Sequence, residues 1–233
     1  MPATDAVNGY RLVVPPGWKR ITTGDGSAAS IDRVITHQLR KRSGTDRVLA
    51  ERELRDVLAQ LVSQSESAGA LDIYVFAERL RGATVSMSFT VSMTFLGALA
   101  DDLDDDDFVS LAGYDAESAQ FLDFPGGRLF RAEERTSRTV AEFLGEASNQ
   151  LGTSSDLDSY AVVGDEATDV MAQAREAQAA GRVLNRTRVS YLAPVPESPG
   201  AFLLVVFSCD DSPLRDAQIY MFDAIMTTLS WTA

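Results

Sequence analysis

The pattern of hydrophobic and polar positions is most regular between residues 83 and 95. The apolar residues there are Ala83, Val85, Met87, Phe89, Val91, Met93 and Phe95, and they alternate with Thr84, Ser86, Ser88, Thr90, Ser92 and Thr94. Because successive side chains of a β-strand point to opposite faces, the alternation predicts one long strand with an apolar face and a hydroxyl face. The apolar face needs a cover, which amphipathic helices before and after the strand can supply.

The chain before residue 83 predicts two further strands and two helices. A short strand over residues 10–14 should end at the Pro-Pro-Gly that follows, because proline donates no hydrogen bond to a neighbouring strand. A polar loop over residues 22–30 should lead to a helix that Ser30 caps and that ends in the basic residues 40–42. Further along, the pattern predicts a helix over residues 46–67 and a central strand over 71–80, which forms a hairpin with residues 83–95.

The chain after residue 95 predicts a second hairpin and a strand-rich C-terminal part. The hairpin pairs residues 120–124 with 128–135, and the last strands cover residues 182–193 and 201–207. Ser212 and Pro213 should open the final helix, with Trp231 closing the core beyond it. Helices are expected over residues 139–151 and 165–180, between strands of one sheet, so residues 138–181 are interpreted as an insertion or elaboration.

These elements predict a single α+β domain over residues 1–233. An antiparallel sheet would be packed between helices, and a strand followed by a helix would come at the C-terminus. No Pro/Gly/Ser-rich stretch separates two cores.

Charge argues against two classes of partner. The net charge of −13 would repel both a nucleic-acid backbone and an anionic membrane surface. Residues 1–60 nevertheless carry ten Lys/Arg against seven Asp/Glu. That basic flank could steer an acidic partner to the N-terminal region, although charged helix faces that are merely solvated explain it as well.

Candidate metal and cofactor sites are weak. Six of the seven residues 101–107 are aspartate, but they lack the spacing of an EF-hand and are better read as a solvated loop. The loop with Gly24 and Gly26 lacks the lysine of a phosphate-binding loop. His37 is the only histidine, and Cys209 the only cysteine, which excludes an intrachain disulfide and a multi-cysteine metal site. We therefore expect no metal and no cofactor.

Targeting signals are not visible in the sequence. The first eight residues lack the charged and apolar regions of a signal peptide, and no apolar run approaches the ~18 residues of a membrane span. A cytoplasmic location without membrane attachment is expected.

A family resemblance is carried by the two ends of the chain. The N-terminal part is Tyr10-Arg-Leu-Val-Val-Pro-Pro-Gly-Trp18, and the C-terminal parts are Tyr191-Leu-Ala-Pro-Val-Pro196, the strand through Phe207 and the run from Phe222 to Trp231. These residues resemble actinobacterial proteins of the Mog1/PsbP-like superfamily. The resemblance implies an antiparallel sheet between helices and a protein-interaction module without a catalytic centre. It implies no functional residue, because no motif of those proteins maps onto this chain.

Three hypotheses for function follow. The first is a non-catalytic, cytoplasmic protein-interaction module with an unknown protein partner, which uses the uncharged hydroxyl face formed by Thr84, Ser86, Ser88, Thr90, Ser92 and Thr94. Cover of that face by a helix of the chain itself, or by a second copy in a homo-oligomer, remains open. The second is a small-molecule-binding protein with a pocket against the same face. The third and least favoured is an enzyme that uses Asp210 or Asp211 beside Cys209, two aspartates that helix capping also explains.

Overall fold

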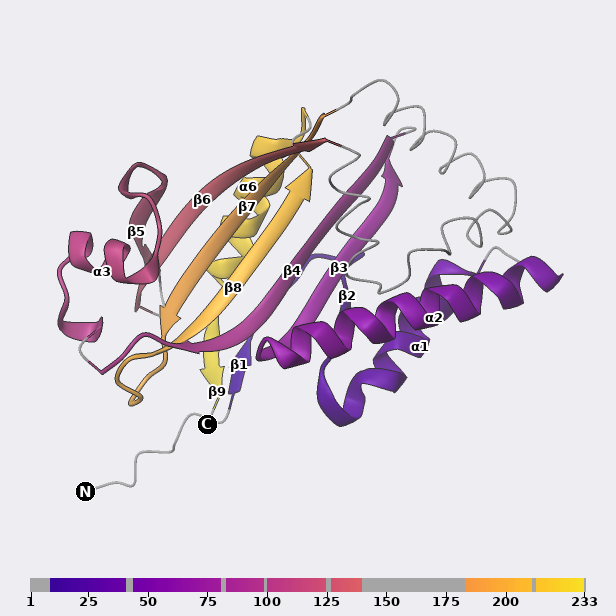
Figure 1. The fold of residues 1–233 in the computed structure, drawn as a ribbon, viewed down its shortest axis with the longest axis horizontal. Helices are drawn as coiled ribbons and strands as arrows, with labels where there is room; N and C mark the ends of the chain where they lie inside the picture. Colours follow the sequence, from indigo (N-terminus) through magenta and orange to yellow (C-terminus); the bar gives the residue numbers. More distant parts are fainter. Residues whose placement is uncertain are drawn as a thin grey trace.

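The long alternating strand lies inside an antiparallel sheet in the computed structural model of the chain, which describes residues 9–40, 44–80, 83–98, 100–124, 127–139, 183–210 and 213–232 (Figure 1). The strand order is β2-β3-β4-β8-β7-β6-β5. The strands are β2 (Lys19–Thr22), β3 (Ala70–Leu80), β4 (Ala83–Phe95), β5 (Ala119–Phe124), β6 (Gly127–Thr139), β7 (Val183–Pro194) and β8 (Ala201–Asp210). Helices α1 (Ser27–Gln38), α2 (Gly44–Ser67), α3 (Asp105–Ala112) and α6 (Arg215–Met226) pack on its two faces.

The predicted hairpin of β3 and β4 is confirmed. The two strands pair from Leu80 and Ala83 at the turn to Ala70 and Ser92 at the far end. On their outer sides β3 pairs with β2 and β4 pairs with β8. Both strands are therefore interior, which the apolar content of residues 71–80 predicts.

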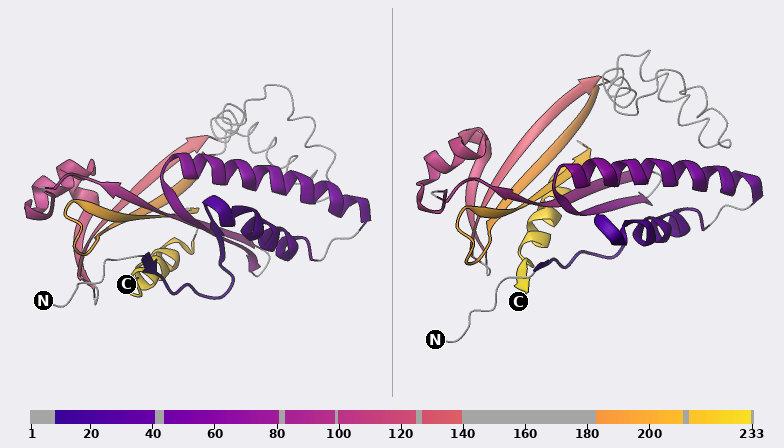
Figure 2. Two further views of the ribbon diagram at one scale, coloured as in Figure 1. Left: turned by 90° about the horizontal axis from the view of Figure 1, so that it is seen from below. Right: turned by 60° about the horizontal axis from the view of Figure 1, so that its bottom comes forward.

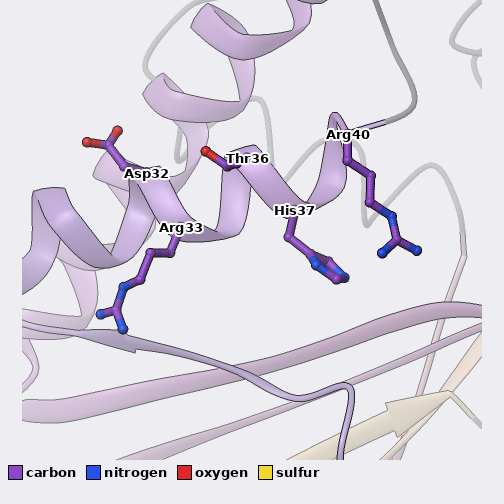
Figure 3. Close-up of a pocket in the computed structure, with 5 residues that line it drawn as sticks. All are labelled: Asp32, Arg33, Thr36, His37 and Arg40. Atoms are coloured by element: carbon purple, nitrogen blue, oxygen red, sulfur yellow. The ribbon is translucent and has the colours of Figure 1, made fainter.

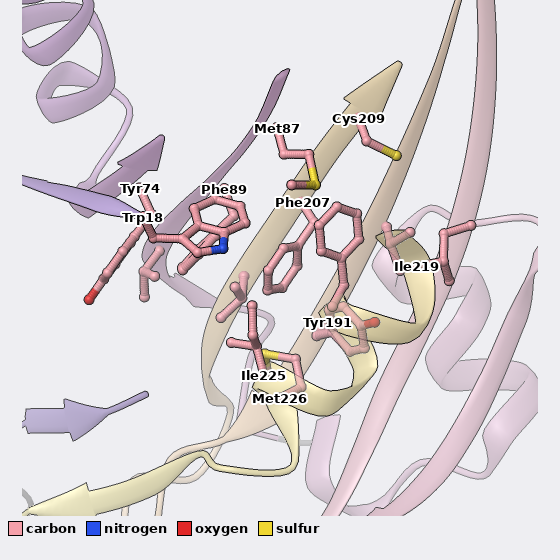
Figure 4. Packing of buried hydrophobic residues seen from close by; sticks show 14 of the residues in the cluster. Trp18, Tyr74, Met87, Phe89, Tyr191, Phe207, Cys209, Ile219, Ile225 and Met226 are labelled. Atoms are coloured by element: carbon pink, nitrogen blue, oxygen red, sulfur yellow. The ribbon is translucent and has the colours of Figure 1, made fainter. Parts of the chain in front are cut away.

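Helix α6 covers one face of the sheet, behind the strands in Figure 1. The apolar side of β4 belongs to the core beneath this helix, through Val85, Met87, Phe89 and Val91. Figure 4 shows aromatic side chains of the strands and the helix packed together, and the ring of Phe207 lies 4.5 Å from the rings of both Phe89 and Phe222. The C-terminal helix thus supplies the cover that the alternating strand requires.

Helices α1 and α2 cover part of the opposite face. They pack over β2 and β3, where Ile21 and Ile73 are register partners in a buried cluster with residues of both helices. Helix α2 ends where the sequence predicts, with Gly69 in the left-handed conformation two residues later. No helix within the described ranges is long and apolar enough to cross a membrane.

Helix α3 packs on the same face at the other end of the sheet. The ring of Phe108 lies 5.4 Å from the rings of Phe130 on β6 and Phe202 on β8. Helices therefore lie on both sides of one antiparallel sheet, as the three views together show, and the α+β class is confirmed (Figure 2). Strand β8 and helix α6 follow each other near the C-terminus as predicted.

A second, two-stranded sheet joins the ends of the described chain. Strand β1 (Gly9–Arg11) pairs with β9 (Ser230–Thr232), and Tyr10 is the register partner of Trp231. The predicted first strand is thus shorter than residues 10–14. Trp231 lies in a strand that the sequence analysis did not predict, because three residues are too few to show an alternating pattern.

The start and end of α1 differ from the prediction. The helix begins at Ser27, so Ser30 is not its cap: the Ser30 hydroxyl donates to the Ser27 carbonyl (2.7 Å) and accepts from the N–H of Thr22 (3.2 Å). The helix ends at Gln38, and Arg40 lies beyond it. Strand β2 was not predicted: it lies just before the predicted loop, overlaps it only at Thr22, and forms by pairing with β3.

The described aspartates of the run are solvated, as predicted, but the run is not all loop: residues 101–102 lie in a 3-10 helix, and Asp105–Asp107 form the first turn of α3. Asp104 caps α3, and its carboxylate accepts a hydrogen bond from the N–H of Asp107 (2.9 Å). Negative side chains in the first turn of a helix are stabilised by the unpaired N–H groups there. Within the described ranges no group of three or more acidic, histidine or cysteine residues could hold a metal ion.

The strands on either side of the expected insertion are neighbours. β6 and β7 pair up to Thr139 and Val183, so Arg138 and Thr139 belong to a strand and the prediction of a helix from Thr139 is wrong at that residue. Cross-strand pairing outweighs the helical spacing there. The rest of the two predicted helices, and Ser212 as a cap, lie outside the described residues, and α6 begins at Arg215 with no side-chain cap.

Candidate functional site

The predicted hydroxyl face lies on the side of the sheet opposite α6. Ser88, Thr90, Ser92 and Thr94 are half-buried there. Thr84 and Ser86 lie in β4 as well, where they pair with Arg79 and Ala77 of β3. One strand therefore carries all six residues, as the alternation predicts.

Strand β8 extends this face. Thr90 is the register partner of Val206, and Ser88 that of Ser208. Val206 and Ser208 are also half-buried. We call the five half-buried residues at the middle of the two strands, Ser88, Thr90, Ser92, Val206 and Ser208, the open strip. Among the described helices, α1 and α2 lie on one side of it and α3 on the other, and none lies over it (Figure 1).

The hydroxyl groups near the open strip have no partner among the residues that the structure describes. Within the described part of the chain no hydrogen bond joins the side chains of Ser88, Thr90, Ser92 or Ser208 to another group. Strand β7 adds Ser190, which is the register partner of Val206. The buried Oγ of Ser190 also has no hydrogen-bond partner among the described residues. Buried polar groups are normally paired, so the half-buried hydroxyls of the strip keep donors and acceptors that no described residue uses, whereas Ser190 is buried and out of reach of an approaching group.

The sequence analysis missed the contribution of β8. The sequence predicts a strand over residues 201–207 that stops before Ser208, and it does not show that Val206 and Ser208 lie beside the hydroxyl face of β4. The only signal was Ser208 itself, at the end of the apolar run. The register with β4 brings it beside Ser88.

A second polar cluster lies beside α6. The Arg131 guanidinium, which is nearly buried, binds Asp223 of α6 through Nε (2.9 Å) and Glu133 through Nη2 (3.4 Å). Arg215 also binds Glu133. Tyr191 donates its hydroxyl to Asp223 (2.5 Å). Since each acid and base of this cluster has a partner of opposite charge or a hydroxyl donor, the cluster ties α6 to β6 and β7 and offers no free base.

Alkaline pH is expected to destabilise the chain through Tyr191. Burial, followed by the hydrogen bond to Asp223, raises the pKa of Tyr191 above the ordinary value of about 10. Above that pH the unfolded state loses the tyrosine proton and the folded state keeps it, so the free energy of unfolding falls by about 1.4 kcal/mol per pH unit. Urea titrations between about pH 9 and 11 measure the slope.

Two variants separate this effect from general alkaline denaturation. Tyr191→Phe should make the alkaline slope shallower and leave the share of Tyr10, whose pKa is also raised, whereas Tyr220→Phe, at a position that is 77% exposed, should leave the slope unchanged. Equal slopes for the wild type and Tyr191→Phe would contradict the raised pKa.

A third polar cluster anchors β1. The Tyr10 hydroxyl donates to Asp72 of β3, and Arg20 binds the same carboxylate through Nε (2.7 Å) and Nη2 (2.8 Å). Burial, the hydrogen bond to Asp72 and its charge raise the pKa of Tyr10. The Asp72 carboxylate therefore joins the small sheet to the large one.

The structure does not bring together the residues that an enzyme mechanism would need. Cys209 is buried beneath α6, whereas His37 lies on α1, over the opposite face of the sheet. The two cannot form a nucleophile and base pair. Asp210 ends β8, and Asp211 lies outside the described residues.

An apolar pocket lies at the α3 end of the same face as the open strip. Its volume is about 300 Å³, and its walls include Phe108, Phe121, Phe130 and Phe202. Arg128 lies over the ring of Phe121 (4.2 Å to the centroid) and pairs with Asp105 (2.6 Å) at the rim. None of the six predicted hydroxyl residues lines it, so it is a different pocket from the one hypothesised against the hydroxyl face.

Comparisons with known proteins do not add to this geometry. No protein-family model matches the chain, and no curated protein or solved structure matches it at a significant level.

Proposed function

We propose that the chain is a non-catalytic protein-interaction module and that its protein partner binds the open strip. The observation that carries the proposal is the row of unpaired, half-buried hydroxyls beside Val206, over which no described helix lies. A sheet face that only meets water commonly carries charged side chains. Small uncharged side chains instead allow a partner backbone or helix to approach closely.

Two further features support a binding role. Among the described residues Cys209 and His37 lie on opposite faces of the sheet, and no group of three or more acidic, histidine or cysteine residues could hold a metal ion. The Mog1/PsbP-like superfamily, whose members bind other proteins, is the architecture we propose, on the strength of the helix-covered antiparallel sheet and the β8–α6 order. A chain with one cysteine is compatible with a reducing compartment, so the proposal keeps the cytoplasm as the location.

A charge placed on the open strip tests the proposal. Thr90→Arg and Ser208→Arg each put a large cation on the strip, and partner affinity should fall at least about tenfold because an unpaired charge would be desolvated in the complex. Affinity capture from the native host, followed by binding measurements with the purified partner, gives the result.

Ala224→Arg is the matched control, because Ala224 is exposed on α6, on the far side of the sheet. Circular dichroism should show that all three variants fold. If the partner is a second copy of the chain, sedimentation should show a dimer that Thr90→Arg dissociates. Recovery of the same proteins at the same affinity by the wild type and both strip variants would refute the proposal.

Small-molecule binding is the second candidate, and the aromatic pocket under α3 favours it. A concave, mostly apolar cavity with a few polar groups at its rim is the usual form of a ligand site, and this one has Asp105 and Arg128 there. A thermal-shift screen of apolar metabolites against the wild type and Leu103→Arg, at a half-buried lining position, separates this function from the first.

A further inference from the structure

A cationic pocket lies on α1, apart from the open strip. Its volume is about 490 Å³, and it is lined by Asp32, Arg33, Thr36, His37 and Arg40. Arg33 and His37 are four residues apart on α1, which places them on one side of the helix, and Arg40 lies two residues beyond its last residue, Gln38. Figure 3 shows these three side chains pointing to the same side of the helix, whereas Asp32 and Thr36 point the other way.

Arg33 and Arg40 of this pocket form no ion pair with an acid among the described residues. The Nε group of Arg33 donates to the carbonyl of Ala29 (3.3 Å), which leaves its two terminal nitrogens free of partners within the described residues. Arg40 is exposed and forms no ion pair with a described residue. The one carboxylate at the pocket, that of Asp32, is bound by Arg55 of α2 at 2.5 Å.

Unpaired cations are unexpected on this chain. Its net charge is −13, and acidic residues outnumber basic ones by 34 to 21. An arginine guanidinium can bind a phosphate with two parallel hydrogen bonds. The imidazole of His37 always carries at least one N–H that can donate as well. The C-terminal end of α1 carries a partial negative charge of about one half, which repels an anion. Each guanidinium carries a full positive charge, so the attraction by the arginines is stronger.

We propose that this pocket binds the diphosphate group of a small molecule. Arg33 lies in the middle of α1 and Arg40 lies beyond its end, and their side chains leave the backbone at separate points (Figure 3), so two linked phosphates can each take one guanidinium group. His37 lies between them in the sequence and contacts the bridge. The pocket is open to solvent, and among the described residues that line it there is no phenylalanine, tyrosine or tryptophan on which a base would stack.

The single histidine makes the test direct. The imidazole resonances of His37 are the only histidine signals of the chain, so they report on this pocket without assignment of the rest. Pyrophosphate added to the full chain at about 0.15 M salt should shift them saturably. The dissociation constant should be at least about tenfold lower than that of orthophosphate.

Other ligands distinguish the source of the diphosphate. ADP should bind about as well as pyrophosphate if the diphosphate alone is recognised, and AMP about as weakly as orthophosphate. Tight binding of citrate, equal to that of pyrophosphate, would overturn the proposal in favour of a general anion surface.

Variants locate the site. Arg33→Gln and Arg40→Gln should each weaken pyrophosphate binding at least about tenfold, because each removes a charge-assisted contact. Arg52→Gln, at an exposed arginine of α2 that does not line the pocket, should change it less than about twofold. Equal losses in all three variants, or no saturable shift of the His37 signal up to about 10 mM pyrophosphate, would overturn the proposal.

Discussion

Replacing Phe207 with alanine is expected to lower the free energy of unfolding by about 3–5 kcal/mol. The side chain is 0% exposed at the centre of the core beneath α6. Its ring lies 4.5 Å from those of Phe89 and Phe222 and 5.6 Å from that of Tyr191. Because β8 pairs on both sides, the strands cannot close the cavity that the missing ring would leave.

Urea unfolding followed by tryptophan fluorescence measures this loss, since Trp18 belongs to the same cluster. Phe95→Ala is the control: Phe95 is 67% exposed at the end of β4, and the change there should stay below about 1 kcal/mol. A comparable small loss for Phe207→Ala would contradict the packing of α6 against the sheet.

The strength of each local pattern explains which elements the sequence predicted. Strand β4 is long and its alternation is unbroken, so its bounds, residues 83–95, agree with the prediction. Helix α2 differs by only two residues at its start, because apolar spacing and Gly69 mark its length. Both elements carry enough residues for a period of two or 3.6 to stand out.

Short strands depend on their partners and were missed. The sequence Lys19-Arg20-Ile21-Thr22 has one apolar residue, and β2 exists because its backbone pairs with β3 while Ile21 packs beneath α1. Strand β9 similarly depends on β1, which lies more than 200 residues earlier. Tertiary pairing of this kind leaves little trace in the local pattern.

The candidate sites divide in the same way. The hydroxyl side of the open strip could be read from β4 alone, whereas Val206 and Ser208 join it only through the register of β8. The spacing of Arg33, His37 and Arg40 is visible in the sequence, but the helix-dipole interpretation of the basic residues near residue 40 hid it. Neither the pocket beside them nor the pairing of Asp32 with Arg55 is visible in the sequence.

The second large effect is expected at Asp72, through the bond that holds β1 to the large sheet. Its side chain is 3% exposed and accepts hydrogen bonds from Tyr10 and Arg20. Asp72→Ala leaves the Tyr10 hydroxyl and the guanidinium without their acceptor. The free energy of unfolding should fall by about 2–4 kcal/mol. The loss should be smaller than for a fully buried ion pair, because Arg20 is half-exposed and its charge is screened by water.

A double-mutant cycle assigns that loss to the Tyr10–Asp72 bond. Tyr10→Phe removes only the hydroxyl, and in that background Asp72→Ala should cost about 1–2 kcal/mol less than in the wild type, because the donor stranded by the single change is already gone. Urea unfolding of the four proteins measures the difference. Additive losses would mean that Asp72 acts through Arg20 alone, and the small sheet would then be held by packing of Tyr10 and Trp231 against the core rather than by the buried carboxylate.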